Sequence, residues 1–507
     1  MKRYLLLAAF SFLLYSPALF NGFLSDDFAL LQDRALTPPS AGELFSPAYW
    51  KGVPEERRGR FRPLRTLSLL ADRAVYGERP AGYHLTNALL NTAAVLAAAG
   101  FGEALFGPWT GLAGAAVFAA YPVHVESVAW VKNRSDLLCA LFSFLSLWAG
   151  LLFMRRGRAR AAAAAAGFCL LGLLSKETAA AVPLAGLAMS RLFAEGAERR
   201  RGYLLWLGLL AAAAAWFVSK EFWWRPELAA APPGDAHSQL AAVLYTLGSY
   251  LALLAFPFRL AAERAFEPAG GWPPGVKLAL AALPALAAWL WYRRDREALF
   301  ALGWTLLLLL PVLNFVPLES RPLAEQRLYL PSLGVAWLAA LAAWRLRGWR
   351  PARPLLGALL LVLSAASLGR TFVWRDDLSF WRDAVAKNPS NYRANYNLAA
   401  EYQRRGSFGE AVKYYEAAAR DADLPEIYYS LAFCYDKVGE YPRSLEAYRM
   451  VERLAQRPSP DLYNNMAIVY EKTGDCKRAG ELYRRALAVD PAYAPARKNL
   501  EDLCAKK

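Results

Sequence analysis

An apolar run near the start of the chain, Tyr4–Phe20 (Y-L-L-L-A-A-F-S-F-L-L-Y-S-P-A-L-F), leads directly into Asn21–Phe28 (N-G-F-L-S-D-D-F). About 20 apolar residues cross a bilayer, so we expect a membrane helix followed by an external loop. Asp26 and Asp27 then lie just outside the membrane, where like-charge repulsion and partial desolvation make a carboxylate pair costly. The pair is therefore a candidate functional site. The alternative is a solvated acid pair that caps a helix.

Apolar runs recur as far as residue 373, and 56% of the chain is hydrophobic, which is typical of an integral membrane protein. The formal net charge of +16 divides into 38 − 23 = +15 for residues 1–375 and 21 − 20 = +1 for residues 376–507. Basic residues cluster in short loops, as cytoplasmic topology signals do, so we expect no nucleic-acid partner. The pattern predicts a membrane domain at 1–373 with about eleven spans, a large first external loop at 22–82 and an external C-terminus.

This topology brings further ionisable side chains to the external face: His124, Glu126, Lys176, Glu177 and Arg327. Carboxylates that accept a proton and cations that neutralise a phosphate suit transfer from a phosphorylated donor to a hydroxyl group. Each residue also has a plainer interpretation, as a helix-end hydrogen-bonding group, a neutralised ion pair or an interfacial anchor. A divalent metal held by Glu126 and Asp26 is a further hypothesis, although the spacing does not demand it.

A different pattern begins at residue 374 and continues to residue 507. Leu-Ala-x-x-Tyr at 398–402 and 431–435, and Met-Ala-x-x-Tyr at 466–470, recur with a period near 34 residues. Glycines, small residues and tyrosines follow in register, which is the tetratricopeptide pattern. We expect three repeats near 391–423, 424–457 and 459–491, plus a capping helix. Such a stack presents an extended surface for peptides or proteins.

Several motifs, taken in order, resemble those of the transmembrane and tetratricopeptide-repeat-containing O-mannosyltransferases. They are F-R-P-L-R-T-L-S (61–68), Y-H-L-T-N-A-L-L-N (83–91), Y-P-V-H-V-E-S-V (121–128), N-R-S-D-L-L (133–138), L-S-K-E-T (174–178) and A-E-Q-R-L-Y-L-P-S (324–332). The chain departs from the family at Tyr121, where histidine is usual, at Asn133, where glycine is common, and at Gln326, which interrupts A-E-R. With the repeats, the resemblance covers nearly the whole chain.

The resemblance implies an all-α fold: a polytopic membrane helical bundle of C-type glycosyltransferase architecture followed by a tetratricopeptide-repeat α-solenoid. It also implies a polyprenyl-phosphate-linked sugar as donor and an acid of the first external loop, Asp26 or Asp27, as catalytic base. The acceptor would be a hydroxyl group, expected on Ser or Thr of a protein held by the repeats. His124, Glu126, Arg134, Lys176, Glu177 and Arg327 are the residues expected to bind the donor phosphate or substrate.

Two alternatives stay open at this point. One is a non-catalytic membrane scaffold whose repeats assemble other proteins, and the other is a transferase that acts on cell-surface glycan. The compact loops and short repeat array indicate a bacterial relative. We therefore expect a multi-pass protein of the cell inner membrane, in contact with membrane lipid, with its repeats on the periplasmic side.

Overall fold

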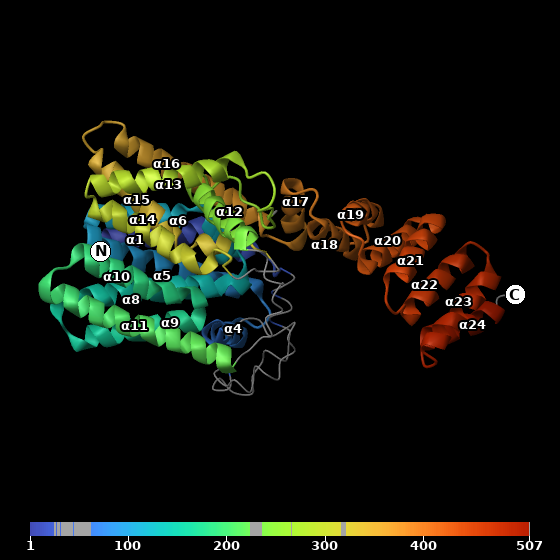
Figure 1. Ribbon diagram of the computed structural model, residues 1–507. Coiled ribbons are helices and arrows are strands. Elements are labelled where there is room, and N and C mark those ends of the chain that lie inside the picture. The colour runs from blue at the N-terminus through green and yellow to red at the C-terminus, as the bar shows by residue number, and fades with distance from the viewer. Residues whose placement is uncertain are drawn as a thin grey trace. The chain divides into compact units, whose positions relative to one another are not determined.

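The computed structural model describes residues 1–24, 27, 31, 44, 62–223, 236–264, 266–315 and 321–505. It divides into two compact units, Met1–Asp376 and Asp377–Lys507. We call them the membrane unit and the repeat unit and describe each by itself. All regular elements among the described residues are helices (Figure 1). This is the fold class that the sequence predicts.

The membrane unit contains long helices joined by short 3-10 turns. The α-helices are α1 (Lys2–Tyr15), α4 (Pro63–Tyr76), α5 (Pro80–Phe106), α6 (Pro108–Ala120), α7 (Val125–Ala129), α8 (Arg134–Arg156), α9 (Ala159–Ser175), α10 (Val182–Phe193), α11 (Gly196–Trp223), α12 (Ala236–Ala255), α13 (Pro274–Tyr292), α14 (Arg296–Leu309), α15 (Ser332–Arg345) and α16 (Ala352–Val373). The 3-10 turns are η1 (Ser16–Phe20), η5 (Pro122–His124), η6 (Val131–Asn133), η7 (Glu177–Ala181), η8 (Leu310–Val312) and η9 (Glu325–Leu328).

Seven of the described helices are long and apolar enough to cross a membrane. An eighth span results if Pro108–Ala120 and Pro122–Ala129, which meet at 57°, count as one. The sequence prediction of about eleven spans also counts shorter apolar runs, including those of α9 and α15. Those helices have only 17 and 14 residues, short of the roughly 20 that cross a bilayer without help. The protein is a multi-pass membrane protein, and its number of spans stays a prediction.

The core of the membrane unit lies around α5 and α8, whose apolar segments are more than half buried in protein. Helices α11, α13 and α16 keep most of their apolar surface exposed, as expected where lipid covers a helix. Glycines allow close packing inside the bundle. A Cβ atom added to Gly150 of α8 or to Gly186 of α10 would lie 2.2 Å from the Trp206 ring of α11.

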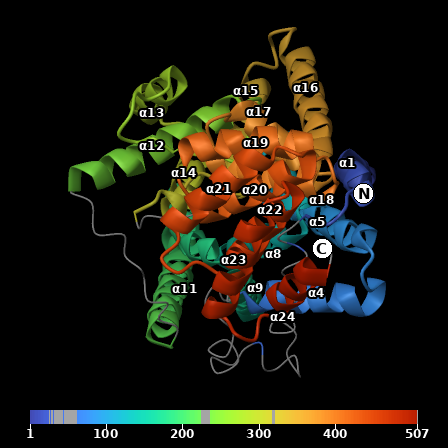
Figure 2. The same ribbon diagram turned by 90° about the vertical axis from the view of Figure 1, so that its right-hand side faces the viewer.

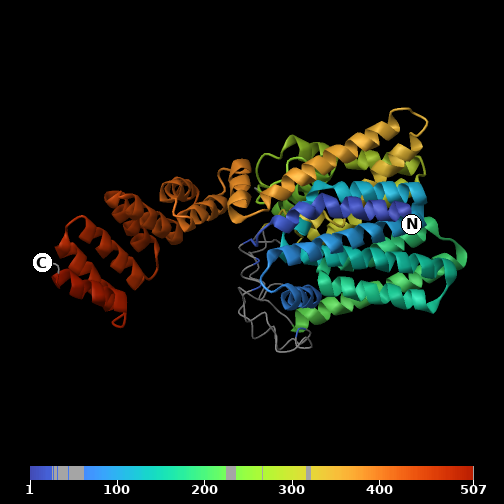
Figure 3. The same cartoon turned by 180° about the vertical axis from the view of Figure 1, so that it is seen from behind.

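The first and last helices of this unit end side by side. The Tyr15 and Ser367 hydroxyls, from α1 and α16, donate to carbonyls at the end of α6 over 3.2 and 2.8 Å. The Gly22 N–H donates to the Arg375 carbonyl over 2.9 Å. Helices α1 and α16 therefore run in the same direction (Figure 3). Arg375 lies at the end of the bundle where the first loop begins, opposite to Lys2.

The repeat unit consists of stacked helix pairs (Figure 2). Its helices are α17 (Asp377–Lys387), α18 (Tyr392–Arg404), α19 (Phe408–Asp421), α20 (Pro425–Val438), α21 (Tyr441–Leu454), α22 (Pro460–Lys472), α23 (Cys476–Val489) and α24 (Ala494–Ala505). Small side chains fill the places where paired helices meet, and Ala411, Ala432 and Ala479 are fully buried. Glycines in the left-handed region, among them Gly439 with φ 84°, connect the paired helices. This is the helical-repeat fold that the spacing predicts.

Candidate active site

A cavity of about 640 Å³ opens in the membrane unit. Its described charged lining residues are Arg62, Arg65, Lys132, Lys176, Glu177, Arg321 and Arg327. Six cations thus face one carboxylate, so the electrostatics favour an anionic ligand. Apolar side chains near η8, among them Leu310 and Phe315, line another part of the wall. The volume lies within the range of small-molecule sites.

Arg65 is a buried cation of the cavity wall. It lies in the first turn of α4, and it is 5% exposed. Its Nε has no hydrogen-bond partner, and it forms no ion pair within the part of the chain that the structure describes. Burial lowers the pKa of the Arg65 guanidinium, and the neighbouring Arg62 charge lowers it further. Because a buried charge without a partner is costly, a bound anion would stabilise this wall.

Two predicted site residues, Lys176 and Glu177, line the cavity. Lys176 directly follows α9, and Glu177 is the first residue of η7. The Lys176 ammonium donates to Asp136 Oδ1 over 2.5 Å. Arg62 donates two hydrogen bonds to the Glu177 carboxylate, from Nη2 over 2.9 Å and from Nε over 3.3 Å. Such bidentate pairs fix geometry as well as charge. The lysine-glutamate turn is therefore tied to α8 and to the residue that precedes α4.

One member of the first-loop acid pair, Asp27, is bonded to the wall of the same cavity. Asp27 is almost fully buried. Its Oδ1 accepts the Lys132 N–H over 2.8 Å, and its Oδ2 accepts the Leu24 N–H over 3.1 Å. Lys132 itself lines the cavity, so Asp27 anchors the first loop to the cavity wall. Asp26 lies outside the described residues.

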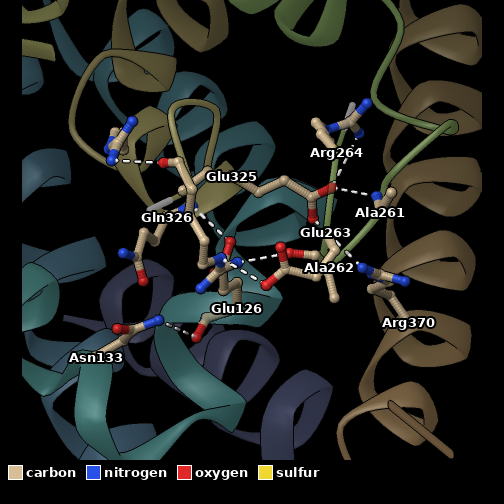
Figure 4. Close-up of polar contacts among 12 residues, drawn as sticks. Glu126, Asn133, Ala261, Ala262, Glu263, Arg264, Glu325, Gln326 and Arg370 are labelled. Atoms are coloured by element: carbon tan, nitrogen blue, oxygen red, sulfur yellow. Dashed lines mark hydrogen bonds and ion pairs between the residues drawn. The ribbon is translucent and has the colours of Figure 1, made fainter. Parts of the chain in front are cut away.

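Glu126 is buried, and both of its carboxylate oxygens accept hydrogen bonds (Figure 4). Its Oε1 accepts Arg321 Nη2 over 2.7 Å, and its Oε2 accepts the Gln326 N–H over 2.9 Å. Arg321 also pairs with Glu263 at 3.3 Å and lies 5.3 Å from the Trp130 ring. Its φ of 52° is unusual for a residue other than glycine. Glu126 thus positions Arg321 and is absent from the described cavity lining.

A second buried carboxylate, Glu325, extends this network (Figure 4). Its Oε1 accepts Arg264 Nη2 over 3.0 Å and also the Ala261 N–H, and its Oε2 lies 3.6 Å from Arg370 Nη2. These contacts join η9, the segment after α12 and α16. The network therefore fixes the backbone from which Arg321 and Arg327 extend.

Arg327 lies in the cavity wall, and neutral acceptors hold its side chain. Its Nη1 donates to the Tyr250 hydroxyl over 3.2 Å and to the Pro322 carbonyl, and its Nη2 donates to the Arg321 carbonyl over 2.9 Å. No carboxylate within the described ranges pairs with it. Its charge is therefore available to an anion in the cavity.

His124 and Arg134 lie elsewhere. His124 is fully buried, with its Nε2 2.8 Å from the Ser332 hydroxyl and its ring 4.3 Å from that of Tyr329. Arg134 is also fully buried; it pairs with Asp72 and donates to Asn87 Oδ1 over 2.7 Å. Neither belongs to the described lining of the cavity.

Four of the cavity cations were not among the predicted site residues: Arg62, Arg65, Lys132 and Arg321. The arginines of F-R-P-L-R were visible in the sequence, as was Arg321 in the loop before the A-E-Q-R motif. Each of the four cations lies in or close to one of the family-like motifs, and this position could have indicated them. Among the described residues, no group of three or more His, Cys, Asp or Glu side chains is placed to hold a metal ion. Glu126 is already bonded to Arg321 and Gln326.

Fold and site together define a multi-pass membrane protein with a cationic cavity, followed by a helical-repeat unit. Residues 73–224 match the family described as Dolichyl-phosphate-mannose-protein mannosyltransferase. Residues 392–420 and 460–493 match Tetratricopeptide repeat. Part of the membrane unit is therefore similar to that mannosyltransferase family, and the repeat unit contains tetratricopeptide repeats.

Curated relatives agree with this combination. Protein O-mannosyl-transferase TMTC4 of Homo sapiens is 24% identical over 77% of this chain and 62% of its own length. Protein O-mannosyl-transferase Tmtc3 of Drosophila melanogaster is 24% identical over 87% of this chain and 57% of its own. Protein O-mannosyl-transferase TMTC2 of Mus musculus is 43% identical over 17% of this chain and 10% of its own.

The chain is thus a distant homologue of the TMTC protein O-mannosyl-transferases, which confirms the resemblance drawn from the motifs. It spans about three fifths of the length of human TMTC4 and of Drosophila Tmtc3.

Proposed function

We propose that the protein is a glycosyltransferase that moves a sugar from a polyprenyl-phosphate carrier to a hydroxyl group, on Ser or Thr of a protein, at the external face of the membrane. The observation that carries the proposal is the cavity with six cations, next to the buried Asp27; among these cations, Arg65 forms no ion pair within the described residues. The likeness to mannosyltransferases makes mannose the first sugar to test.

In the proposed reaction, a first-loop carboxylate accepts the proton of the acceptor hydroxyl. The acceptor oxygen then forms a bond to the anomeric carbon, the bond from that carbon to the phosphate oxygen breaks, and polyprenyl phosphate leaves with the bonding electrons. A single inverting displacement of this kind needs one base and no second catalytic acid, because the leaving group is already charged.

Asp26 is the better candidate for the base. Both oxygens of Asp27 accept main-chain N–H groups, from Leu24 and Lys132, and these bonds give Asp27 the role of an anchor. We therefore assign proton transfer to Asp26 and positioning of the loop to Asp27.

Cations of the cavity would stabilise the departing phosphate. Arg65 and Arg327 are the strongest candidates, since neither is paired with a carboxylate among the described residues. Lys176 and Arg321 lie in the same wall but share their charge with Asp136 and Glu126. Preorganised charges aimed at a developing anion are commonly the largest contribution to catalysis.

The external side of the repeats is also part of the proposal. What supports it is the common direction of α1 and α16: Arg375 bonds to Gly22 at the end of the bundle that carries the first loop. The repeat unit follows directly in the sequence, so it would emerge on the face where transfer occurs. It would raise the local concentration of a protein acceptor.

The test is transfer from radiolabelled polyprenyl-phosphate mannose to a Ser/Thr peptide by the purified full-length chain. We expect the Asp26→Asn variant to lose about two to four orders of magnitude in rate, the usual contribution of a general base. Glu195→Gln, which changes an exposed acid between α10 and α11, is the matched control and should keep the wild-type rate. Equal rates in Asp26→Asn and wild type would refute the assigned base.

Label in glycan only would change the acceptor class. No transfer by folded wild-type protein from any polyprenyl-phosphate sugar would overturn the proposal in favour of a scaffold.

A further inference from the structure

A further cavity, of about 1000 Å³, lies among helices α1, α6, α15 and α16 of the membrane unit (Figure 1). We call it the apolar groove, because Arg3 is the single charged residue of its described lining. The groove lies at the end of the unit where α1 begins, whereas the cationic cavity lies near the first loop, to which α1 leads. One lipid therefore cannot place its phosphate in both sites.

Three helices that run in the same direction contribute similar faces to the groove. They do so with segments 3–10 of α1, 109–116 of α6 and 357–364 of α16, and in each segment the first, fourth, fifth and eighth residues line the groove. Residues with this spacing lie on one face of a helix. Seven steps of 1.5 Å make each face about 10 Å long, compared with about 15 Å for the hydrocarbon of one leaflet. The groove therefore covers most of the depth to which an acyl chain extends.

The wall of the groove is apolar and leaves room for a chain. Ala113 and Ala116 of α6 fill little of the space, and Leu6 and Leu361, which also line the groove, are each 71% exposed. A Cβ atom added to Gly357, another lining residue, would meet no heavy atom within 4 Å. Apolar surface gains free energy when an apolar partner covers it, so a hydrocarbon chain suits this wall.

Aromatic side chains mark the level of the membrane surface at one end of the groove. The Trp109 and Trp344 rings, both in the groove wall, lie 6.0 Å apart, and the Arg347 guanidinium lies 4.2 Å from the Trp344 ring. Tryptophans are enriched where a membrane protein meets the headgroups. Arg3 is in the first turn of α1, and Trp109 is in the first turn of α6. Arg3 therefore lies at the depth of the lipid headgroups.

The charge at this end of the unit favours an anionic headgroup. Arg3 forms no ion pair within the described ranges, and neither do Arg350 and Arg353 beside the start of α16. Glu103 of α5, a carboxylate near the start of α1, accepts the Tyr4 hydroxyl over 2.6 Å. A basic residue at a membrane surface strengthens binding of anionic lipid about fivefold. Hydrocarbon and negative charge together describe an anionic lipid.

We propose that the apolar groove binds an anionic phospholipid, with an acyl chain along the three helical faces and the phosphate at Arg3. This goes beyond the proposed sugar transfer, because it concerns a lipid that is neither donor nor acceptor. A phospholipid is favoured over a polyprenyl phosphate, since the cations that suit the donor phosphate line the cavity at the other end of the unit. Binding can be measured without any transfer reaction, so the two proposals fail separately.

The experiment is native mass spectrometry of the delipidated full-length chain in detergent, titrated with one of two lipids. Dioleoyl phosphatidylglycerol and dioleoyl phosphatidylcholine have the same acyl chains and differ in the charge of the headgroup. We expect the first molecule of phosphatidylglycerol to bind at least fivefold more tightly than the first molecule of phosphatidylcholine. Equal affinities, or no saturable binding of phosphatidylglycerol, would overturn the proposal.

Gly357→Leu fills the groove and tests where the acyl chain lies. We expect this variant to bind the first phosphatidylglycerol at least fivefold more weakly than wild type. The matched control is Gly208→Leu on α11, where an added Cβ atom also meets no heavy atom within 4 Å. The control should bind within twofold of wild type. Both variants should unfold at the wild-type temperature or above, since leucine favours a helix more than glycine does. Wild-type binding by Gly357→Leu, or equal losses in both variants, would show that the site is wrong.

Arg3→Gln tests the contact with the phosphate and changes only an exposed side chain. We expect the preference for phosphatidylglycerol over phosphatidylcholine to fall about fivefold, while the affinity for phosphatidylcholine stays within twofold of wild type. Arg158→Gln, an exposed cation before α9 at the same end of the unit, should keep the preference. An unchanged preference in Arg3→Gln would overturn the assigned contact.

A short-chain polyprenyl phosphate is the competing source of a phosphate on a hydrocarbon chain. In tenfold excess it should leave the phosphatidylglycerol that Gly357→Leu weakens bound to the wild-type chain. Displacement of that lipid would assign the groove to the polyprenyl carrier, and the proposal would be wrong.

Discussion

The two units of the molecule differ in how deeply their ion pairs are buried. In the membrane unit, the ion pairs around the cavity are buried and join segments far apart in sequence, as Glu126 and Arg321 do with 0% and 17% of their side chains exposed. In the repeat unit, ion pairs lie on the surface, as Arg443 and Glu416 do with 52% and 35% exposed, while alanines and tyrosines form the core. Charge therefore shapes the site in the membrane unit, whereas packing shapes the repeat unit.

The largest effect on stability should come from breaking a buried pair in the membrane unit. Glu126→Gln leaves Arg321 without its closest carboxylate, and loss of one partner of a buried pair costs about 3–5 kcal/mol. We expect a markedly lower unfolding temperature in detergent, followed by intrinsic tryptophan fluorescence. Glu263→Gln, which removes the longer contact to Arg321, should have a smaller effect. Equal stability of Glu126→Gln and wild type would contradict the contrast.

Arg65→Gln should separate function from stability. Removing a buried cation that lacks a partner should leave the unfolding temperature unchanged or raise it, since the charge is costly in the folded protein. Donor binding should weaken about 10- to 100-fold, because a hydrogen bond to a charged group contributes about 1.5–3 kcal/mol. Isothermal titration with a short-chain polyprenyl phosphate measures this. Arg65→Lys, which keeps the charge, should bind more tightly than Arg65→Gln.

Overpacking tests the repeat unit, where we expect an effect without any change in charge. Ala432 is fully buried in α20, so Ala432→Leu should destabilise the stack by about 1–3 kcal/mol. Circular dichroism during thermal unfolding of the full-length chain would show the repeat transition moving to lower temperature. Ala418→Gly is a useful comparison, because it removes a buried methyl group and so reduces the side-chain volume instead of increasing it.

The smallest effect should come from a surface pair of the repeat unit. Arg443→Ala removes contacts to Glu416 and Glu440, but exposed pairs contribute at most about 1 kcal/mol. The same thermal measurement should give a shift close to experimental error, and added salt should remove what remains. A loss as large as that of Glu126→Gln would erase the distinction between the two units.

The sequence predicted the helical class of both units because long apolar runs and a repeat of 34 residues are local signals. It also indicated Lys176, Glu177 and Arg327, which line the cavity. Arg134 could not be placed in this way. Its partner Asp72 lies on α4, in a stretch that was predicted as part of the external loop. The side chain to which Arg134 turns therefore depends on tertiary packing.

Glu126 shows the same limit. Its partner Arg321 is 195 residues away in the chain, and no local pattern relates the two. In the sequence Glu126 resembles a residue that binds substrate. In the structure its carboxylate is buried and holds the Arg321 side chain instead. Family-like motifs thus pointed to Lys176 and Arg327, which line the cavity, whereas the contact between Glu126 and Arg321 could be found only in the fold.

The hydrogen bond between Gly22 and Arg375 bears on how the repeats can be removed in the laboratory. Arg375 precedes the unit boundary at Asp376 by one residue, and Arg370, which lies 3.6 Å from Glu325, is only five residues earlier. A truncation placed before residue 370 would delete the repeats together with two attachments of the first loop and η9. A chain ending after Asp376 keeps both attachments, so only that cut point isolates what the repeats contribute.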